Sequence, residues 1–183
     1  MKRLPIIVAL AGLLTCLIAS CGDDDNNWAD YTEWREANDA WYEEQKALTN
    51  PDGSLYYTPV VPSWYQGSGV LMHYFNDRSL TQGNLRPLAN SSVKVKYKGE
   101  LYNGAGFDSS YTEVDSCRTF TLGPDLIMGW RIALADMHVG DSAAVVIPWA
   151  QAYGMTGNSG ITPFSDLLFQ IKLVDIVTYE LRP

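Results

Sequence analysis

The side chains of this sequence that could act on a substrate are aromatic rings, a carboxylate and a phenol. Phe107 stands next to Asp108, and Trp130 and Tyr153 follow later in the same half of the chain. Such a set can bind and orient a substrate by apolar burial and hydrogen bonding, but it includes no strong nucleophile. Taken singly, each of these residues could equally be an ordinary core, turn or surface residue.

Covalent and metal-dependent chemistry is poorly supported by the other residues. The two histidines, His73 and His138, are too far apart in sequence and pattern to predict a metal site or a catalytic triad. Gly67-Ser68-Gly69 precedes a predicted strand rather than a helix, so it is no nucleotide-binding fingerprint. We therefore expect neither a metal nor another cofactor.

The chain is acidic, with a net charge of −8 over 183 residues. Most of the excess lies in residues 22–53, which hold ten acidic and two basic residues. Because an acidic chain without a basic stripe has no electrostatic footprint for phosphates, we expect no nucleic-acid partner. The length fits one domain of ordinary size with an appendage.

Five short motifs follow one another between Val93 and Val177. In chain order they are Val93-Lys94-Val95-Lys96-Tyr97-Lys98-Gly99, Phe107-Asp108-Ser109-Ser110, Leu122-Gly123 with Ile127-Met128-Gly129-Trp130, Ala152-Tyr153-Gly154, and Leu167-Leu168-Phe169-Gln170-Ile171-Lys172-Leu173. Their order and spacing resemble an FKBP-type peptidyl-prolyl cis/trans isomerase domain, over roughly residues 70–177. The resemblance implies rotation about Xaa-Pro bonds of proline-containing polypeptides, in a shallow apolar pocket between a sheet and a short helix.

The resemblance also assigns a role to individual residues. Trp130 would form the floor of the pocket, Asp108 would lie at its rim, and Tyr153 would place its hydroxyl over it. The backbone N–H of Ile127 would donate a hydrogen bond to a substrate carbonyl, and Ile161 would lie in the loop that closes one side. The walls would be Tyr97, Phe107, Leu126, Ile127 and Phe169.

The sequence departs from the family pattern at several of these places. Arg118 stands where an aromatic pocket residue is common, so we expect it to contact substrate and to alter peptide preference. The segment from Gly123 to Trp130 is about one residue short. Asn158, Thr162 and Phe164 replace common residues of the loop after Tyr153, which makes macrolide affinity less secure than isomerase activity.

Hydrophobic periodicity predicts the elements that would position these residues. Apolar and charged residues alternate over Val93–Leu101, which predicts a strand with one buried face, and Asn103-Gly104 predicts a hairpin turn after it. Asp125–Met137 has helical spacing. Further strands are expected at Val70–Phe75, Ala143–Ile147 and Leu167–Leu173. The fold class is therefore α+β, with an antiparallel half-barrel sheet wrapped around one short helix.

A second helix is expected at Trp28–Leu48, as an N-terminal extension. Its aromatic residues fall largely on one face, and its acidic residues take much of the remainder. This aromatic face could pack on the body of the same molecule, which we favour, or bind a partner or a second copy. Residues 54–69, with two prolines and two glycines, are expected to be a meandering connection to the domain at 70–183.

Residues 1–20 have the pattern of a signal peptide, with Lys2 and Arg3 before a short apolar run. The ending Ile18-Ala19-Ser20-Cys21 resembles a bacterial lipobox, in which Cys21 becomes the lipidated N-terminus. A signal peptide cut elsewhere, or a retained anchor, is the alternative. Residues 21–27 would be an acidic tether, either a spacer or a surface-export signal of the Bacteroidetes-like kind. These features predict a cell-envelope protein held by lipid in the outer membrane, with exposure on the cell surface as one alternative.

Two functions remain open from the sequence. The first is a prolyl isomerase that acts on exported proteins. The second is the same fold as a low-activity chaperone or a binding module of an envelope assembly, with the Trp28–Leu48 helix as its docking face. The pocket residues favour the first, whereas Arg118 and the aromatic helix favour the second.

Overall fold

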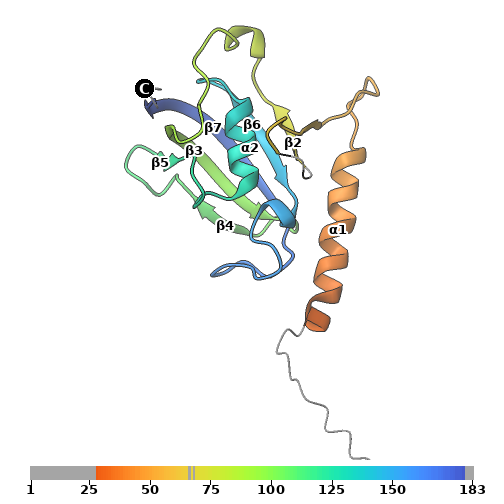
Figure 1. Ribbon diagram of the computed structural model, residues 1–183. Helices are drawn as coiled ribbons and strands as arrows, with labels where there is room; N and C mark the ends of the chain where they lie inside the picture. The colour runs from red at the N-terminus through yellow and green to blue at the C-terminus, as the bar shows by residue number, and fades with distance from the viewer. Residues whose placement is uncertain (1–27, 66, 68, 180–183) are drawn as a thin grey trace, which may run out of the picture.

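The computed structural model describes residues 28–65, 67 and 69–179; the expected signal peptide, Cys21 and the acidic tether lie outside these residues. One antiparallel sheet curves around a short helix, and a longer helix stands beside the β2–β6 end of the sheet (Figure 1). The architecture is the α+β fold that the sequence predicts. None of the helices in this part of the chain has the length and apolar content needed to cross a membrane.

The sheet has seven strands in the order β1-β2-β6-β7-β3-β4, and β5 also pairs with β3. Their bounds are β1 (Thr58–Val60), β2 (Val70–Tyr74), β3 (Ser92–Leu101), β4 (Gly106–Ser109), β5 (Arg118–Thr121), β6 (Ser142–Ile147) and β7 (Leu167–Thr178). The helices are α1 (Thr32–Ala47) and α2 (Met128–Asp136), with short 3-10 turns at Trp28–Tyr31, Arg78–Leu80 and Trp149–Gln151.

The long central strand β3 follows from its alternating sequence. Val93, Val95 and Tyr97 are buried beneath the sheet, while the lysines between them face solvent to different extents. The strand pairs with β7 along its whole length, and with both β5 and β4 on its other edge. The predicted hairpin is confirmed: Gly104 has a φ of +81°, a left-handed conformation that glycine adopts without strain.

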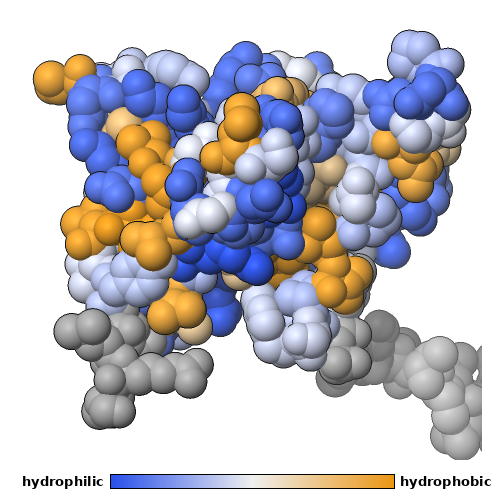
Figure 2. Space-filling view, turned by 90° about the horizontal axis from the view of Figure 1, so that it is seen from above, coloured by the Kyte–Doolittle hydropathy of each residue, from blue (hydrophilic) through white to orange (hydrophobic). Residues whose placement is uncertain are grey.

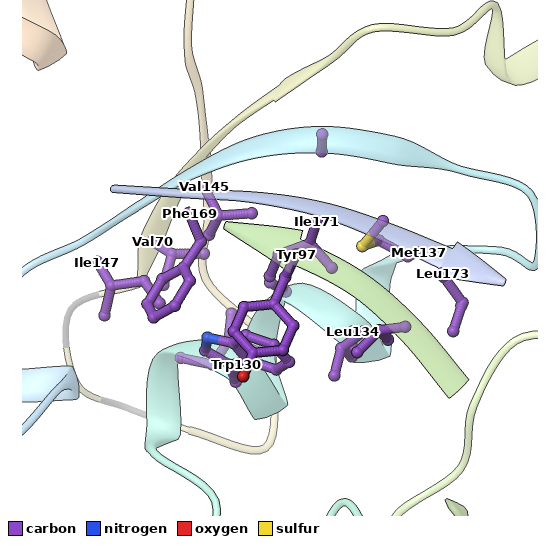
Figure 3. Packing of buried hydrophobic residues seen from close by; sticks show 14 of the residues in the cluster. Val70, Tyr97, Trp130, Leu134, Met137, Val145, Ile147, Phe169, Ile171 and Leu173 are labelled. Atoms are coloured by element: carbon purple, nitrogen blue, oxygen red, sulfur yellow. The ribbon is translucent and has the colours of Figure 1, made fainter. Parts of the chain in front are cut away.

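Helix α2 fills the concave face of the sheet. Figure 3 shows the rings of Tyr97 and Phe169 reaching from the strands toward Trp130 of α2, with Leu134 and Met137 further along. The helix begins three residues later than its periodicity suggests, at Met128. The backbone of Ile127 is extended, with a ψ of 144°, so Leu126 and Ile127 lie in the preceding loop and not on the helix.

Strand β6 is buried on both faces, which explains its uninterrupted apolar sequence. Ala143, Val145 and Ile147 join the core beneath α2, whereas Ala144 and Val146 form a second cluster on the opposite face. Trp41 and Tyr42 of α1, with Tyr56 and Leu168, pack against this second cluster. The aromatic face of α1 therefore packs on the body of the same chain, which was the alternative that the sequence analysis favoured.

Polar contacts fix α1 to the segment that precedes β7. The Asp166 N–H donates to the side-chain oxygen of the fully buried Asn38 (2.7 Å), whose amide donates to the Trp34 carbonyl oxygen (2.7 Å). The indole N–H of Trp34 donates to the Ser165 hydroxyl (3.1 Å), and that of Trp149 donates to the Asp39 carboxylate (3.2 Å). Helix α1 thus supports the loop 149–166.

Two strands were not expected from the sequence. Residues 54–69 are not wholly a connection, because β1 lies within them and pairs with β2. Pro59 stands in the middle of this three-residue strand, and proline is tolerated there because β1 is an edge strand. Strand β5 has only four residues, too few for alternation to be distinguished from chance.

The carboxyl group of Asp166 gives the stability a pH dependence. Asp166 is 1 % exposed; one oxygen accepts from the Trp149 N–H, and no described group lies within hydrogen-bonding distance of the other. Burial, with a smaller effect of the Asp39 carboxylate, raises its pKa to about 7. In the unfolded chain the pKa of an aspartate is about 3.9. Between about pH 3.9 and pH 7 the folded state therefore binds more protons than the unfolded state, so the free energy of unfolding falls as pH rises through this range.

We therefore expect Asp166→Asn to reduce the loss of thermal stability between pH 5 and pH 8. The Asn side chain keeps the acceptor for Trp149 but cannot ionise. Melting temperatures of both proteins at the two pH values test this, with the exposed Glu44→Gln as a control that removes one negative charge from α1. If Asp166→Asn and Glu44→Gln changed the pH dependence equally, the buried carboxyl would not be its source.

Candidate functional site

A pocket of about 250 Å³ opens between the start of α2 and the strands that curve around it. Eight of the predicted site residues line it: Tyr97, Phe107, Asp108, Leu126, Ile127, Trp130, Tyr153 and Phe169. These residues come from β3, β4, α2, β7 and two loops, so only the tertiary fold brings them together. The remaining lining residues are Phe120, Asp125 and Asn158.

The floor of the pocket is the nearly buried indole of Trp130. Rings of Tyr97, Phe120 and Phe169 meet it edge to face, with centroids 5.0, 5.1 and 5.2 Å away. This is the geometry that aromatic quadrupoles favour, and it gives the indole a defined orientation. Phe107 extends the wall through a further edge-to-face contact with Phe169, at 5.5 Å.

The width of the pocket depends on a glycine in β3. A Cβ at Gly99 would come within 2.6 Å of the Phe169 ring and 2.8 Å of the Phe107 ring. Both distances are too short for carbon atoms in contact, so only glycine lets the two rings lie over this strand. Gly99 thus has a role in the site that its place in the Lys98-Gly99 motif did not reveal.

The rim carries a closed group of polar side chains. The Tyr97 hydroxyl donates to one Asp108 carboxylate oxygen (2.6 Å), and the Arg118 guanidinium donates to the other (2.9 Å). Arg118 also donates to the Tyr97 hydroxyl (2.8 Å) and to Glu113 (3.0 Å). Burial and the hydrogen bond to Asp108 raise the pKa of Tyr97 above its ordinary value, so it remains a neutral phenol.

The structure places Arg118 at the rim, and its predicted contact with substrate stays a prediction. Its side chain does not line the pocket; it is engaged with Asp108, Glu113 and Tyr97 at the rim. Ile161 is not among the residues that line the pocket, and its side chain belongs to the hydrophobic core. Asn158, with which Ile161 forms a short antiparallel bridge, lines the pocket from this loop instead.

Two hydrogen-bond donors at the pocket have no partner among the described residues. They are the hydroxyl of Tyr153 and the backbone N–H of Ile127, and both residues line the cavity. The extended backbone of Ile127, just before α2, leaves its N–H outside the helical pattern. Both donors are therefore available to a carbonyl group of a bound substrate.

Sequence reasoning missed Phe120 and Asp125 as pocket residues. Phe120 lies in β5, a strand that was not predicted, and its ring meets both Tyr97 and Trp130. Asp125 lies in the loop that was assigned to the helix. In the part of the chain that the structure describes, no three His, Cys, Asp or Glu side chains gather as ligands for a metal ion.

The family model of the FKBP-type peptidyl-prolyl cis-trans isomerases matches residues 83–174, which is half of the chain. A crystal structure of a peptidyl-prolyl cis-trans isomerase from Pseudomonas syringae pv. tomato is 30 % identical, with a TM-score of 0.62, and the match covers 80 % of this chain and 96 % of that one. The chain belongs to the FKBP-type peptidyl-prolyl cis-trans isomerase family.

Individual relatives share the domain rather than the whole chain. The isomerase FkpA of Escherichia coli K12 is 39 % identical over 90 residues, which are 49 % of this chain and 33 % of FkpA. The crystal structure of FkpA has a TM-score of 0.64 at 28 % identity, over 81 % of this chain and 63 % of that one. Peptidyl-prolyl cis-trans isomerase FPR2 of Saccharomyces cerevisiae is 40 % identical over 95 residues, 50 % of this chain and 70 % of FPR2.

The close approach at Gly99 yields a prediction for the site. We expect Gly99→Ala to displace the Phe107 and Phe169 rings into the pocket, because a methyl group occupies the space they use. Overpacking of this kind costs about 1–3 kcal/mol, which urea unfolding would measure. Gly83→Ala, where nothing lies within 4 Å of the added Cβ, is the control. Equal stabilities of the two variants would contradict the proposed steric role.

Proposed function

We propose that this chain catalyses cis/trans isomerisation of Xaa-Pro bonds in polypeptides at the Trp130 pocket. The observation that carries the proposal is an aromatic-lined cavity of about 250 Å³ with two unengaged donors beside it, on Tyr153 and Ile127. A prolyl ring would lie on Trp130, between the aromatic walls of this cavity. The donors would then meet the carbonyl groups of the substrate backbone.

The chemistry of the reaction explains why such a pocket needs no nucleophile. Amide resonance opposes rotation with a barrier of about 18–20 kcal/mol, while proline leaves the cis and trans forms nearly equal in free energy. In the transition state the amide is twisted and less dipolar than in the planar ground state. An apolar surrounding disfavours the planar form more than the twisted form, which is preferential binding of the transition state.

The size of the required effect indicates which side chains matter most. A turnover of about 10 s⁻¹ corresponds to a barrier of roughly 16 kcal/mol, so the protein must lower the barrier of about 18–20 kcal/mol by about 2–4 kcal/mol. One neutral hydrogen bond contributes about 0.5–1.5 kcal/mol. The hydroxyl of Tyr153 is therefore insufficient by itself, and the aromatic walls around Trp130 supply most of the effect.

A low-activity chaperone or binding module remains the second candidate function. Arg118 favours it, because this side chain holds the rim carboxylate of Asp108, which limits how the rim can respond to substrate. The aromatic face of α1, which the sequence suggested as a docking face, gives weaker support to the binding-module function. Trp34 packs edge to face on Tyr102 at 5.0 Å, and Trp41 and Tyr42 contact the sheet.

We further propose that the protein is exported, anchored by lipid on Cys21 in the cell envelope, and active on exported polypeptides. The support is the sequence alone: a basic start, a short apolar run and the Ile18–Cys21 ending. The acidic residues that follow Cys21 would hold the domain away from the membrane. A single acyl chain binds membranes only weakly, so stable anchoring requires several chains on this terminus.

Isomerisation of short Xaa-Pro peptides by the chain without residues 1–21 tests the enzymatic function. We expect clear acceleration, a two- to tenfold loss in Tyr153→Phe because one hydrogen bond is removed, and nearly complete loss in Trp130→Ala. Tyr111→Phe, which alters an exposed tyrosine outside the pocket, is the matched control. Circular dichroism verifies that Trp130→Ala is folded.

Other outcomes of this assay discriminate between the functions. No acceleration by the folded wild-type protein would leave the binding module as the function. A complete loss of activity in folded Tyr153→Phe would show that the hydroxyl, and not the apolar walls, provides most of the catalysis.

Lipidation of Cys21 is tested by expression of the full chain in a bacterium supplied with radiolabelled palmitate. We expect label in the wild-type protein and recovery in the membrane fraction, and neither in Cys21→Ser. Cys117→Ser is the matched control, because this half-buried thiol is the other cysteine outside the expected signal segment. Label retained in Cys21→Ser would refute the lipobox assignment.

A further inference from the structure

A second cavity, of about 450 Å³, lies beside the start of the loop that joins β5 to α2, where Leu122 lines it. We call it the α2 groove. Its main lining residues are Trp64, Arg86, Leu88, Leu122, Arg131 and Ala135, none of which lines the Trp130 pocket. The α2 groove is therefore a separate site, to which α2 contributes Arg131 and Ala135 in place of Trp130.

The α2 groove is largely apolar yet open to solvent. Trp64 is 53 % exposed and Leu88 is 40 % exposed, and Leu85 and Val61 nearby in the chain are exposed as well. Seen from above, the protein carries separate hydrophobic patches within a mostly hydrophilic surface (Figure 2). An exposed apolar cavity with an aromatic residue at its edge is typical of a binding surface.

The two arginines of the α2 groove have no carboxylate partner among the described residues. The other three described arginines, at positions 35, 78 and 118, each form an ion pair with aspartate or glutamate. Arg86 instead donates to the Ala135 carbonyl oxygen, and Arg131 lies 6.0 Å from the centre of the Trp64 ring. In a chain of net charge −8, two such guanidinium groups in one cavity mark a place for an anionic group.

The α2 groove and the Trp130 pocket are neighbours. Leu122 lines the groove, and Asp125, Leu126 and Ile127 of the same short loop line the pocket. On α2, the adjacent residues Trp130 and Arg131 line the pocket and the groove respectively. A polypeptide held at the pocket therefore has the groove within a few residues along the chain.

We propose that the α2 groove binds an apolar, acidic segment of the same polypeptide whose prolyl bond is isomerised; this inference rests on the proposed function. An aliphatic or aromatic side chain would lie against Trp64 and Leu88, and a neighbouring carboxylate would meet Arg131 and Arg86. Recognition is by side chains rather than by strand addition, because Pro59 interrupts the nearby edge strand β1.

Direct binding tests the α2 groove without any need for isomerase activity. The probe is a fluorescein-labelled, proline-free hexapeptide with a central Leu-Phe pair flanked by glutamates, and its partner probe has glutamines instead. We expect fluorescence anisotropy to show binding of the acidic peptide to the wild-type protein. Arg131→Gln weakens it about two- to fivefold, as for one exposed ion pair, and Trp64→Ala weakens it at least about tenfold. Lys172→Gln, which removes one positive charge from the exposed side of β7, leaves it unchanged.

Equal affinity for the acidic and glutamine peptides, or equal effects of Arg131→Gln and Lys172→Gln, would overturn the proposal. The segment after Tyr179 is the alternative occupant to be tested, since the Tyr179 hydroxyl donates to the Arg86 carbonyl oxygen (2.7 Å). If the peptide bound only after deletion of residues 180–183, that segment would be the occupant and the proposal would fail.

Kinetics connect the α2 groove to the reaction. The first substrate is an unfolded protein whose refolding rate is limited by prolyl isomerisation, and the second is a proline-containing tetrapeptide. Trp64→Ala and Arg131→Gln should raise KM for the unfolded protein by the factors seen in binding. For the tetrapeptide, kcat/KM should stay unchanged. An equal decrease for both substrates would mean a structural defect and would overturn the proposal. Peptide binding without isomerase activity in the wild type would refute the proposed function and would support the groove as a binding site.

Discussion

The enclosure of one indole by strand-borne rings is the interaction on which the rest of the domain depends. Trp130 can be a pocket floor only if the sheet curves far enough for rings of β3, β5 and β7 to reach it edge to face. This requires a strand long enough to pair with three others and a glycine at position 99 where two rings pass over it. The pocket is thus a consequence of core packing rather than a cavity added to a finished fold.

The N-terminal helix extends this arrangement to the opposite face of the sheet. It covers Ala144 and Val146, which would otherwise expose apolar surface, and its polar contacts hold the segment 149–166. Because Tyr153 and Asn158 belong to that segment, the position of two pocket residues depends on a helix that lies outside the family-matched residues.

The sequence predicted well what depends on long patterns. Nine alternating residues identified β3, and an apolar run identified β6. Only the structure shows that α1 is the reason for burial of the second face of β6. The Phe107-Asp108, Trp130 and Tyr153 assignments came from motif order, and the structure places all four around one cavity. The short strands β1 and β5 were not predicted, because three or four residues are too few to show a periodic pattern. Phe120 was missed as a pocket residue because it lies in β5. The rim position of Arg118 depends on side-chain direction, which no spacing encodes.

The polar rim has a further consequence for recognition. Tyr97, Asp108 and Arg118 hold one another through three hydrogen bonds, and Glu113 fixes the guanidinium from outside. Long polar side chains that become ordered only on binding lose rotational freedom, at about 0.5–1.5 kcal/mol each. Here that freedom is already lost in the folded protein, so a ligand meets an edge of fixed shape. Selectivity at this edge should therefore arise from rigidity, with ligands that do not match its shape excluded rather than accommodated.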